Sequence, residues 1–122
     1  MFIMQHFKKT NKIACVDYKS EVAEDFKSSF GFKHSFLIPE KSFPLLKNVE
    51  KPVAIISTYH SDHASLAEKI FITNPSTLIF IEKPPTVTLD DLDKLVKLYK
   101  KGAKIEMGFN RRFIKFSNYI VS

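Results

Sequence analysis

Short, wholly apolar runs separated by longer amphipathic stretches limit the possible fold of this chain more than any other feature. Val53–Ile56 and Leu78–Ile81 are apolar at every position. A strand has this composition when both of its faces are covered, as in a parallel sheet between helices. Longer segments with apolar residues at helical spacing lie between such runs. The pattern therefore predicts an α/β fold with a mostly parallel sheet flanked by helices.

The expected elements alternate along the chain. We expect strands at residues 12–17, 53–57, 77–81 and 104–107, helices at 20–30 and 62–72, and a short helical turn at 43–46. Thr88 is expected to cap a further helix that Gly102 ends. The side chains of this helix expected to face the sheet are Leu89, Leu92, Leu95, Val96 and Tyr99. One domain over residues 1–122 is expected.

Charge and hydropathy exclude several classes of protein. The net charge is +6, but the lysines are scattered, which favours a solvated helix face over a nucleic-acid site. The apolar runs are far shorter than the roughly 20 residues needed to cross a bilayer. The first residues lack the pattern of a signal peptide. We therefore expect a cytoplasmic protein that binds neither membrane nor nucleic acid.

Cysteine and histidine content argues against disulfides and metals. Cys15 is the only cysteine, which excludes an internal disulfide and a cysteine-rich zinc site, and we expect it in the core. His60, Asp62 and His63 offer ligand types that suit zinc, but their spacing matches no standard site. No metal is expected.

Polar residues follow four of the expected strands at the points where the strands end. The four segments are Asp17-Tyr18, Ser57-Thr58-Tyr59-His60, Glu82-Lys83-Pro84 and Gly108-Phe109-Asn110-Arg111-Arg112. Open parallel sheets bind ligands beyond the carboxyl ends of their strands. Polar residues also mark strand ends in general, but their recurrence at four ends favours one functional cluster.

Two of these residues suggest a specific chemistry. An acid at the position of Asp17 accepts hydrogen bonds from ribose hydroxyls in dinucleotide-binding folds; the alternative is a turn aspartate. Lys83 lies between a strand end and two prolines, a rigid place that suits a proton donor or acceptor; the alternative is a solvated charge. Hydride transfer from an alcohol requires such a group, because the hydroxyl proton must also leave.

From Asn11 onward the chain resembles the N-terminal domain of the Gfo/Idh/MocA oxidoreductases, the glucose–fructose oxidoreductase or inositol dehydrogenase family. The resemblance rests on the order and approximate spacing of several motifs. They are Val53-Ala54-Ile55-Ile56-Ser57-Thr58, His63, Phe80-Ile81-Glu82-Lys83-Pro84, a helix capped by threonine, and Gly108-Phe109-Asn110-Arg111-Arg112-Phe113.

The resemblance implies a Rossmann-like domain that binds NAD or NADP and acts on sugars, inositols or related polyols. It implies that Lys83 is the catalytic lysine. The residues implied to contact the cofactor are Asp17, Ser57, Thr58, Glu82 and Arg112, and those on the substrate side are His63, Asn110 and Arg111. NAD is favoured over NADP, because the carboxylate of Asp17 would repel a 2′-phosphate.

The sequence departs from the family pattern at both ends. The three glycines, Gly31, Gly102 and Gly108, form no Gly-x-Gly-x-x-Gly turn, and residues 1–10 have the spacing of the helix that follows this turn. The family's first strand and second domain are not found. We therefore expect a truncated Rossmann-like domain that forms a homo-oligomer or has its sheet completed by a partner chain. Two functions follow: an NAD(P)-dependent oxidoreductase domain, whose activity alone is open, or a non-catalytic remnant or interaction module.

Overall fold

A computed structural model describes residues 14–32 and 34–108 of the chain. Its two compact units divide between Asn48 and Val49. The helix expected at residues 1–10 lies outside the described residues, as do Asn110, Arg111 and Arg112. The expectation of a single domain stays a prediction.

The first unit is built on two parallel strands. β1 (Ala14–Val16) pairs with β2 (His34–Phe36), with Ala14 opposite His34. α2 (Ser20–Phe30) connects the strands and α3 (Pro39–Lys47) follows them, and both helices pack against this pair. Gly31 ends α2 at a φ of 70°, a left-handed conformation that glycine adopts without steric cost.

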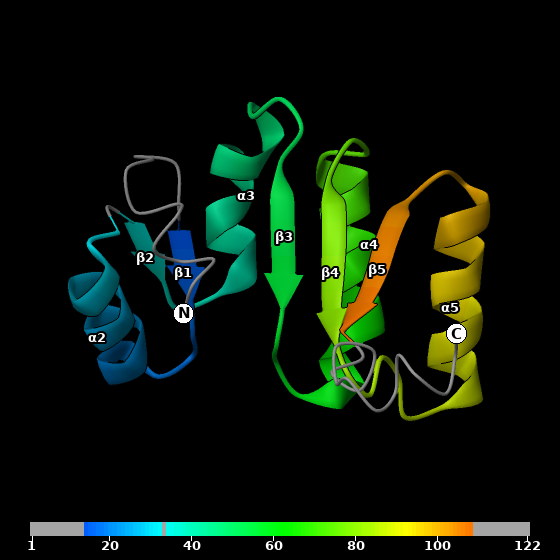
Figure 1. The fold of residues 1–122 in the computed structure, drawn as a ribbon, viewed down its shortest axis with the longest axis horizontal. Coiled ribbons are helices and arrows are strands. Elements are labelled where there is room, and N and C mark those ends of the chain that lie inside the picture. Colours follow the sequence, from blue (N-terminus) through cyan, green and yellow to red (C-terminus); the bar gives the residue numbers. More distant parts are fainter. Residues whose placement is uncertain (1–13, 33, 109–122) are drawn as a thin grey trace, which may run out of the picture. The chain divides into compact units, whose positions relative to one another are not determined.

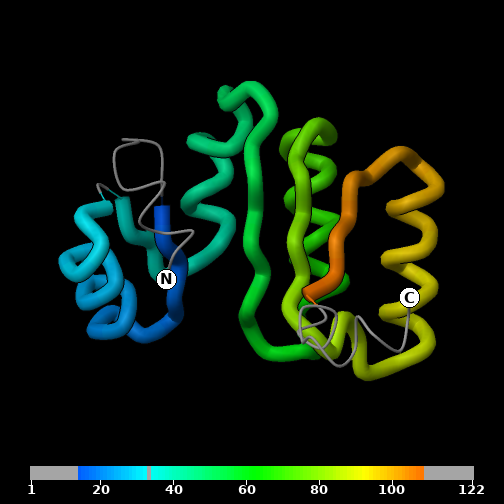
Figure 2. The backbone as a smooth tube through the Cα atoms, viewed as in Figure 1, coloured from blue at the N-terminus to red at the C-terminus, as the bar shows by residue number. Residues whose placement is uncertain are grey.

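The second unit contains a three-stranded parallel sheet in the order β3-β4-β5 (Figure 1). Its strands are β3 (Val53–Ile56), β4 (Leu78–Glu82) and β5 (Lys104–Gly108). The short 3-10 helix η1 (His60–Asp62) and α4 (His63–Thr73) lead from β3 to β4, and α5 (Leu89–Lys100) leads from β4 to β5. The backbone trace in Figure 2 follows this alternation, with α4 behind the strands and α5 packed alongside α4.

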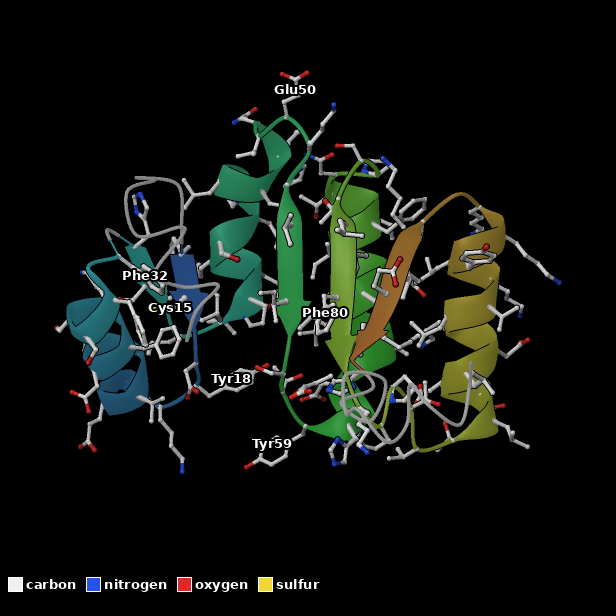
Figure 3. All side chains as sticks on the ribbon, viewed as in Figure 1. Cys15, Tyr18, Phe32, Glu50, Tyr59 and Phe80 are labelled. Atoms are coloured by element: carbon white, nitrogen blue, oxygen red, sulfur yellow. The ribbon has the colours of Figure 1, made fainter. Side chains whose placement is uncertain are left out.

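The core of the second unit lies between this sheet and its two helices. Ile56, Ile79 and Ile81 are fully buried on the helix-covered face of the sheet. The helices contribute the buried residues Ala64, Ala67, Ile70, Leu95 and Leu98. Because strand side chains alternate between faces, the neighbours of these isoleucines point to the opposite face. Val53, Ile55, Leu78 and Phe80 are exposed there, and Phe80 is labelled in Figure 3.

The structure confirms the α/β class with parallel strands flanked by helices. It also confirms the expected cap of α5, where the Thr88 hydroxyl accepts a hydrogen bond of 3.1 Å from the Asp91 N–H. Among the described residues, no helix is long and apolar enough to cross a membrane.

Three local expectations are wrong. The turn expected at 43–46 is the nine-residue helix α3, which begins at Pro39 and contains Pro44. The strand β2 is not among the expected elements. In α5, four of the five side chains expected to face the sheet are exposed, namely Leu89, Leu92, Val96 and Tyr99, with Leu89 at 82% and Tyr99 at 68%. Leu95 and Leu98, three residues apart, are the side chains that α5 buries.

Candidate functional site

The carboxyl ends of β3, β4 and β5 meet at one edge of the sheet, because all three strands run in the same direction (Figure 1). Ser57 and Thr58 follow β3 there. Glu82 is the last residue of β4, and Lys83 follows it. Four of the residues predicted to form the site therefore lie at the carboxyl ends of two neighbouring strands of the same unit.

His63 connects these two loops. Its ring is fully buried at the first position of α4. The Nδ1 atom lies 3.1 Å from the Pro84 carbonyl oxygen, and the Nε2 atom lies 3.1 Å from the Thr58 carbonyl oxygen. One imidazole thus bridges the segment after β3 and the segment after β4. For the His63 ring to contact a substrate directly, one of its nitrogens would have to leave its carbonyl partner.

Lys83 is exposed at the tip of the second loop. Within the described part of the chain its amine forms no ion pair or hydrogen bond, and the peptide bond to Pro84 is cis. An exposed lysine side chain directly after β4 can reach a ligand bound at the strand ends. The arrangement is compatible with the predicted catalytic role.

Gly108 closes the site on the β5 side. It pairs with Glu82 in the parallel register and is buried. A Cβ atom at this position would lie 3.0 Å from Cε1 of the Phe80 ring and 3.4 Å from Oε1 of Glu82. Phe80 and Glu82 therefore occupy the space beside the Gly108 backbone. The order of residues in the sequence does not reveal this packing role of Gly108.

Ser57 is exposed and Thr58 is half-buried after β3. Tyr59, the next residue, is 76% exposed and points away from the loop below β3 (Figure 3). Hydroxyl, carboxylate and ammonium groups are thus all present where the two loops meet. These groups can donate and accept hydrogen bonds to a polar ligand.

Asp17 lies in the first unit, one residue beyond β1. Its backbone N–H donates to the Phe36 carbonyl oxygen at 3.1 Å, which extends the pairing with β2. Its Oδ1 atom accepts a hydrogen bond of 2.8 Å from the Lys19 N–H, the geometry of an aspartate turn. The alternative of a turn aspartate is therefore realised, and the ribose contact stays a prediction.

Cys15 occupies the middle of β1. Its thiol donates to the Ala23 carbonyl oxygen at 3.4 Å. Burial is the main cause that raises the pKa of this thiol above its ordinary value of 9.0. The thiol is half-buried rather than fully in the core, and a group of this kind serves in packing.

In the part of the chain that the structure describes, no three His, Cys, Asp or Glu side chains are grouped to hold a metal ion. Arg112, predicted to contact the cofactor, and Asn110 and Arg111, predicted on the substrate side, are outside the described residues. Their roles stay predictions.

Parallel strands joined by helices, with polar side chains beyond the strand ends, define the class of nucleotide-binding α/β proteins. Residues 1–109 match the model of the oxidoreductase family with an NAD-binding Rossmann fold. The chain belongs to this Gfo/Idh/MocA family. The resemblance seen in the sequence motifs is thereby confirmed.

Several solved dehydrogenase structures are similar to this chain in fold. Myo-inositol 2-dehydrogenase from Lactobacillus plantarum aligns with a TM-score of 0.76 and 16% identity over 97% of this chain and 36% of that chain. Myo-inositol dehydrogenase from Lactobacillus casei, in complex with NAD(H) and myo-inositol, gives 0.71 and 20% over 94% and 35%. A probable dehydrogenase from Thermotoga maritima gives 0.70 and 23% over 82% and 29%.

These likenesses establish the fold. The chain spans about a third of the length of the solved structures that it matches. No curated protein sequence matches it.

Proposed function

We propose that this chain supplies the NAD-binding side of an oxidoreductase that transfers hydride to or from a sugar, an inositol or a related polyol. The observation that carries the proposal is the position of Lys83. Its exposed amine, which has no partner among the described residues, lies at the carboxyl end of β4, next to the Thr58 loop that His63 connects to it. Family membership and inositol dehydrogenases of the same fold support the same activity.

The chemistry of the donor set fits the nicotinamide end of the cofactor. The hydroxyls of Ser57 and Thr58 can donate hydrogen bonds to a carboxamide and accept them from it, and the carboxylate of Glu82 can accept from its amide N–H groups. NAD supplies the hydride acceptor when it is bound. Asp17 is proposed to accept from the adenosine ribose, which favours NAD over NADP, and Arg112 is proposed to lie at the cofactor's edge.

Lys83 is proposed to move the proton of the substrate hydroxyl. When an alcohol is oxidised, the O–H proton passes to the lysine amine while the C–H hydrogen leaves with its electron pair to the cofactor. In the reverse direction the ammonium group returns the proton to the carbonyl oxygen. A positioned proton-transfer group contributes about 10²–10⁴-fold to a rate. His63, Asn110 and Arg111 were predicted on the substrate side, and for Asn110 and Arg111 we retain that proposal.

Calorimetric titration with NAD⁺, NADH and NADPH tests the cofactor proposal, and reduction of NAD⁺ with a panel of inositols and sugars tests the reaction. We expect Lys83→Ala to bind NAD⁺ as the wild type does and to lose about 10²–10⁴-fold in turnover. Lys100→Ala, which removes another exposed lysine at the end of α5, should change neither. Absence of binding by the wild type at millimolar cofactor would reject the function, and equal turnover of both variants would reject the role of Lys83.

A partner that completes the sheet is proposed as well. Among the described strands β3 is an edge of its sheet, and Val53 and Ile55 on it are 58% and 61% exposed. Edge strands usually carry charges or prolines that discourage pairing. The four residues of β3, Val53–Ile56, include neither. The composition of β3 supports association with a second copy or with a partner strand.

A further inference from the structure

The two ring nitrogens of His63 face an unusual pair of hydrogen-bond partners. Both of its partners, the carbonyl oxygens of Thr58 and Pro84, can only accept hydrogen bonds. A ring with one N–H donates to one of them, and a ring with two N–H groups donates to both. The ring is fully buried, so water does not take the place of either partner.

The two carbonyls belong to loops with different proposed roles. Thr58, with Ser57 before it, is proposed to line the cofactor. Pro84 directly follows Lys83, the proposed proton-transfer residue. Moving either carbonyl would move the neighbouring functional side chain, because backbone and side chain share one segment. A displacement of about 1 Å in a catalytic group costs up to about 100-fold in rate.

We propose that His63 is a positioning residue that fixes the cofactor loop and the lysine loop relative to each other through its two ring nitrogens. This inference rests on the proposed function for the consequence in catalysis, but the bridge itself does not. His63 is itself held in place, because it is the first residue of α4 and is followed in the same helix by the buried Ala64 and Ala67. Its ring meets the His60 ring edge-on, with centroids 5.8 Å apart.

Two amide variants separate the two halves of the bridge. In His63→Asn the amide nitrogen can take the place of Nδ1 and keep the bond to Pro84, while the bond to Thr58 is lost. In His63→Gln the longer side chain can place its nitrogen near Nε2, keep the bond to Thr58 and lose the bond to Pro84. His63→Phe keeps an aromatic ring and removes both ring nitrogens.

Backbone amide NMR of the full chain and its variants reads out the bridge without any ligand. We expect His63→Asn to shift the amides of residues 57–59 and spare Lys83, His63→Gln to do the reverse, and His63→Phe to shift both. The buried strand residues Ile79 and Ile81 should stay unchanged in the two amide variants. If both amide variants shift the same residues, or shift Ile79 and Ile81 as strongly as the loops, His63 is a packing residue and the proposal is overturned.

Cofactor titration and turnover extend the test to function. We expect His63→Asn to weaken NAD⁺ binding about tenfold, and His63→Gln to keep the affinity and lower kcat about tenfold, the size of one net hydrogen bond. An equal loss of both quantities in the two variants would overturn the division of roles between the two bonds. If the wild type binds no cofactor, the proposed function fails, while the amide shifts still decide whether the bridge exists.

Discussion

The two leucines Leu95 and Leu92 of α5 give the sharpest test of how the second unit is packed. Leu95 is 3% exposed and Leu92 is 44% exposed. Truncation to alanine changes intrinsic helix propensity equally at both positions, so that contribution cancels in the comparison. The remaining difference reports which face of α5 meets its neighbours.

The expected magnitudes follow from burial. Removing a buried leucine side chain costs about 2–5 kcal/mol, since the transfer free energy is lost and a cavity remains. A leucine that is about half-buried has gained only about half of the 1.5–3 kcal/mol of full burial, so Leu92→Ala should cost about 1 kcal/mol. Leu95→Ala should therefore exceed Leu92→Ala by about 2 kcal/mol, a factor of about 30 in the ratio of folded to unfolded chain.

Urea denaturation followed by far-ultraviolet circular dichroism measures this difference. With a slope of about 1 kcal/mol per molar urea, the two midpoints should lie about 2 M apart. Equal midpoints would refute the packing described here, and a larger loss for Leu92→Ala would mean that Leu92 rather than Leu95 is the buried leucine of the pair.

Two further predictions concern Cys15 and the open edge of β3. Because burial raises the pKa of Cys15, alkylation of the folded chain should accelerate at higher pH than alkylation of the chain in urea, and identical pH profiles would contradict this burial. By linkage, the contribution of this thiol to stability should be complete below pH 9.0 and should be lost as the pH rises through the folded pKa. Ile55→Lys should shift the chain toward monomer in light scattering, because a charge on an edge strand discourages pairing. Tyr99→Lys adds the same charge at an exposed position of α5 and should leave the mass unchanged. An unchanged mass for Ile55→Lys would exclude pairing through β3.

The sequence predicted the fold class and the proximity of the residues after β3 and β4 for one physical reason. Wholly apolar runs require cover on both faces, which implies parallel strands, and parallel strands gather their ends at one edge. Thr58, Glu82 and Lys83 follow from that reasoning alone. The bridge through His63 does not, because its partners are backbone carbonyls, which leave no trace in the order of side chains.

The helices show where periodicity stops being informative. α5 carries apolar residues on two adjoining stripes, and spacing alone cannot choose between them. Leu95 and Leu98 are the buried residues of α5, because α5 packs against α4. β2 has only three residues, His34 to Phe36, which is too short to display any alternation. In α3, Pro39 and Pro44 conceal the helix, since proline usually marks the start or the end of one.

Because helices separate its strands along the chain, the second unit can form the site only when it folds as a whole. Thr58 and Lys83 are separated by the whole of α4 and β4, and Gly108 lies beyond α5, at the end of β5. A peptide that contains only one of these segments would not form the site, because each segment contributes only some of its residues. Formation of the site requires contacts between distant parts of the chain, which form late and slowly in folding. Ligand affinity should therefore vanish at the same denaturant concentration as the helical signal, and a protease cut within α4 should abolish both together.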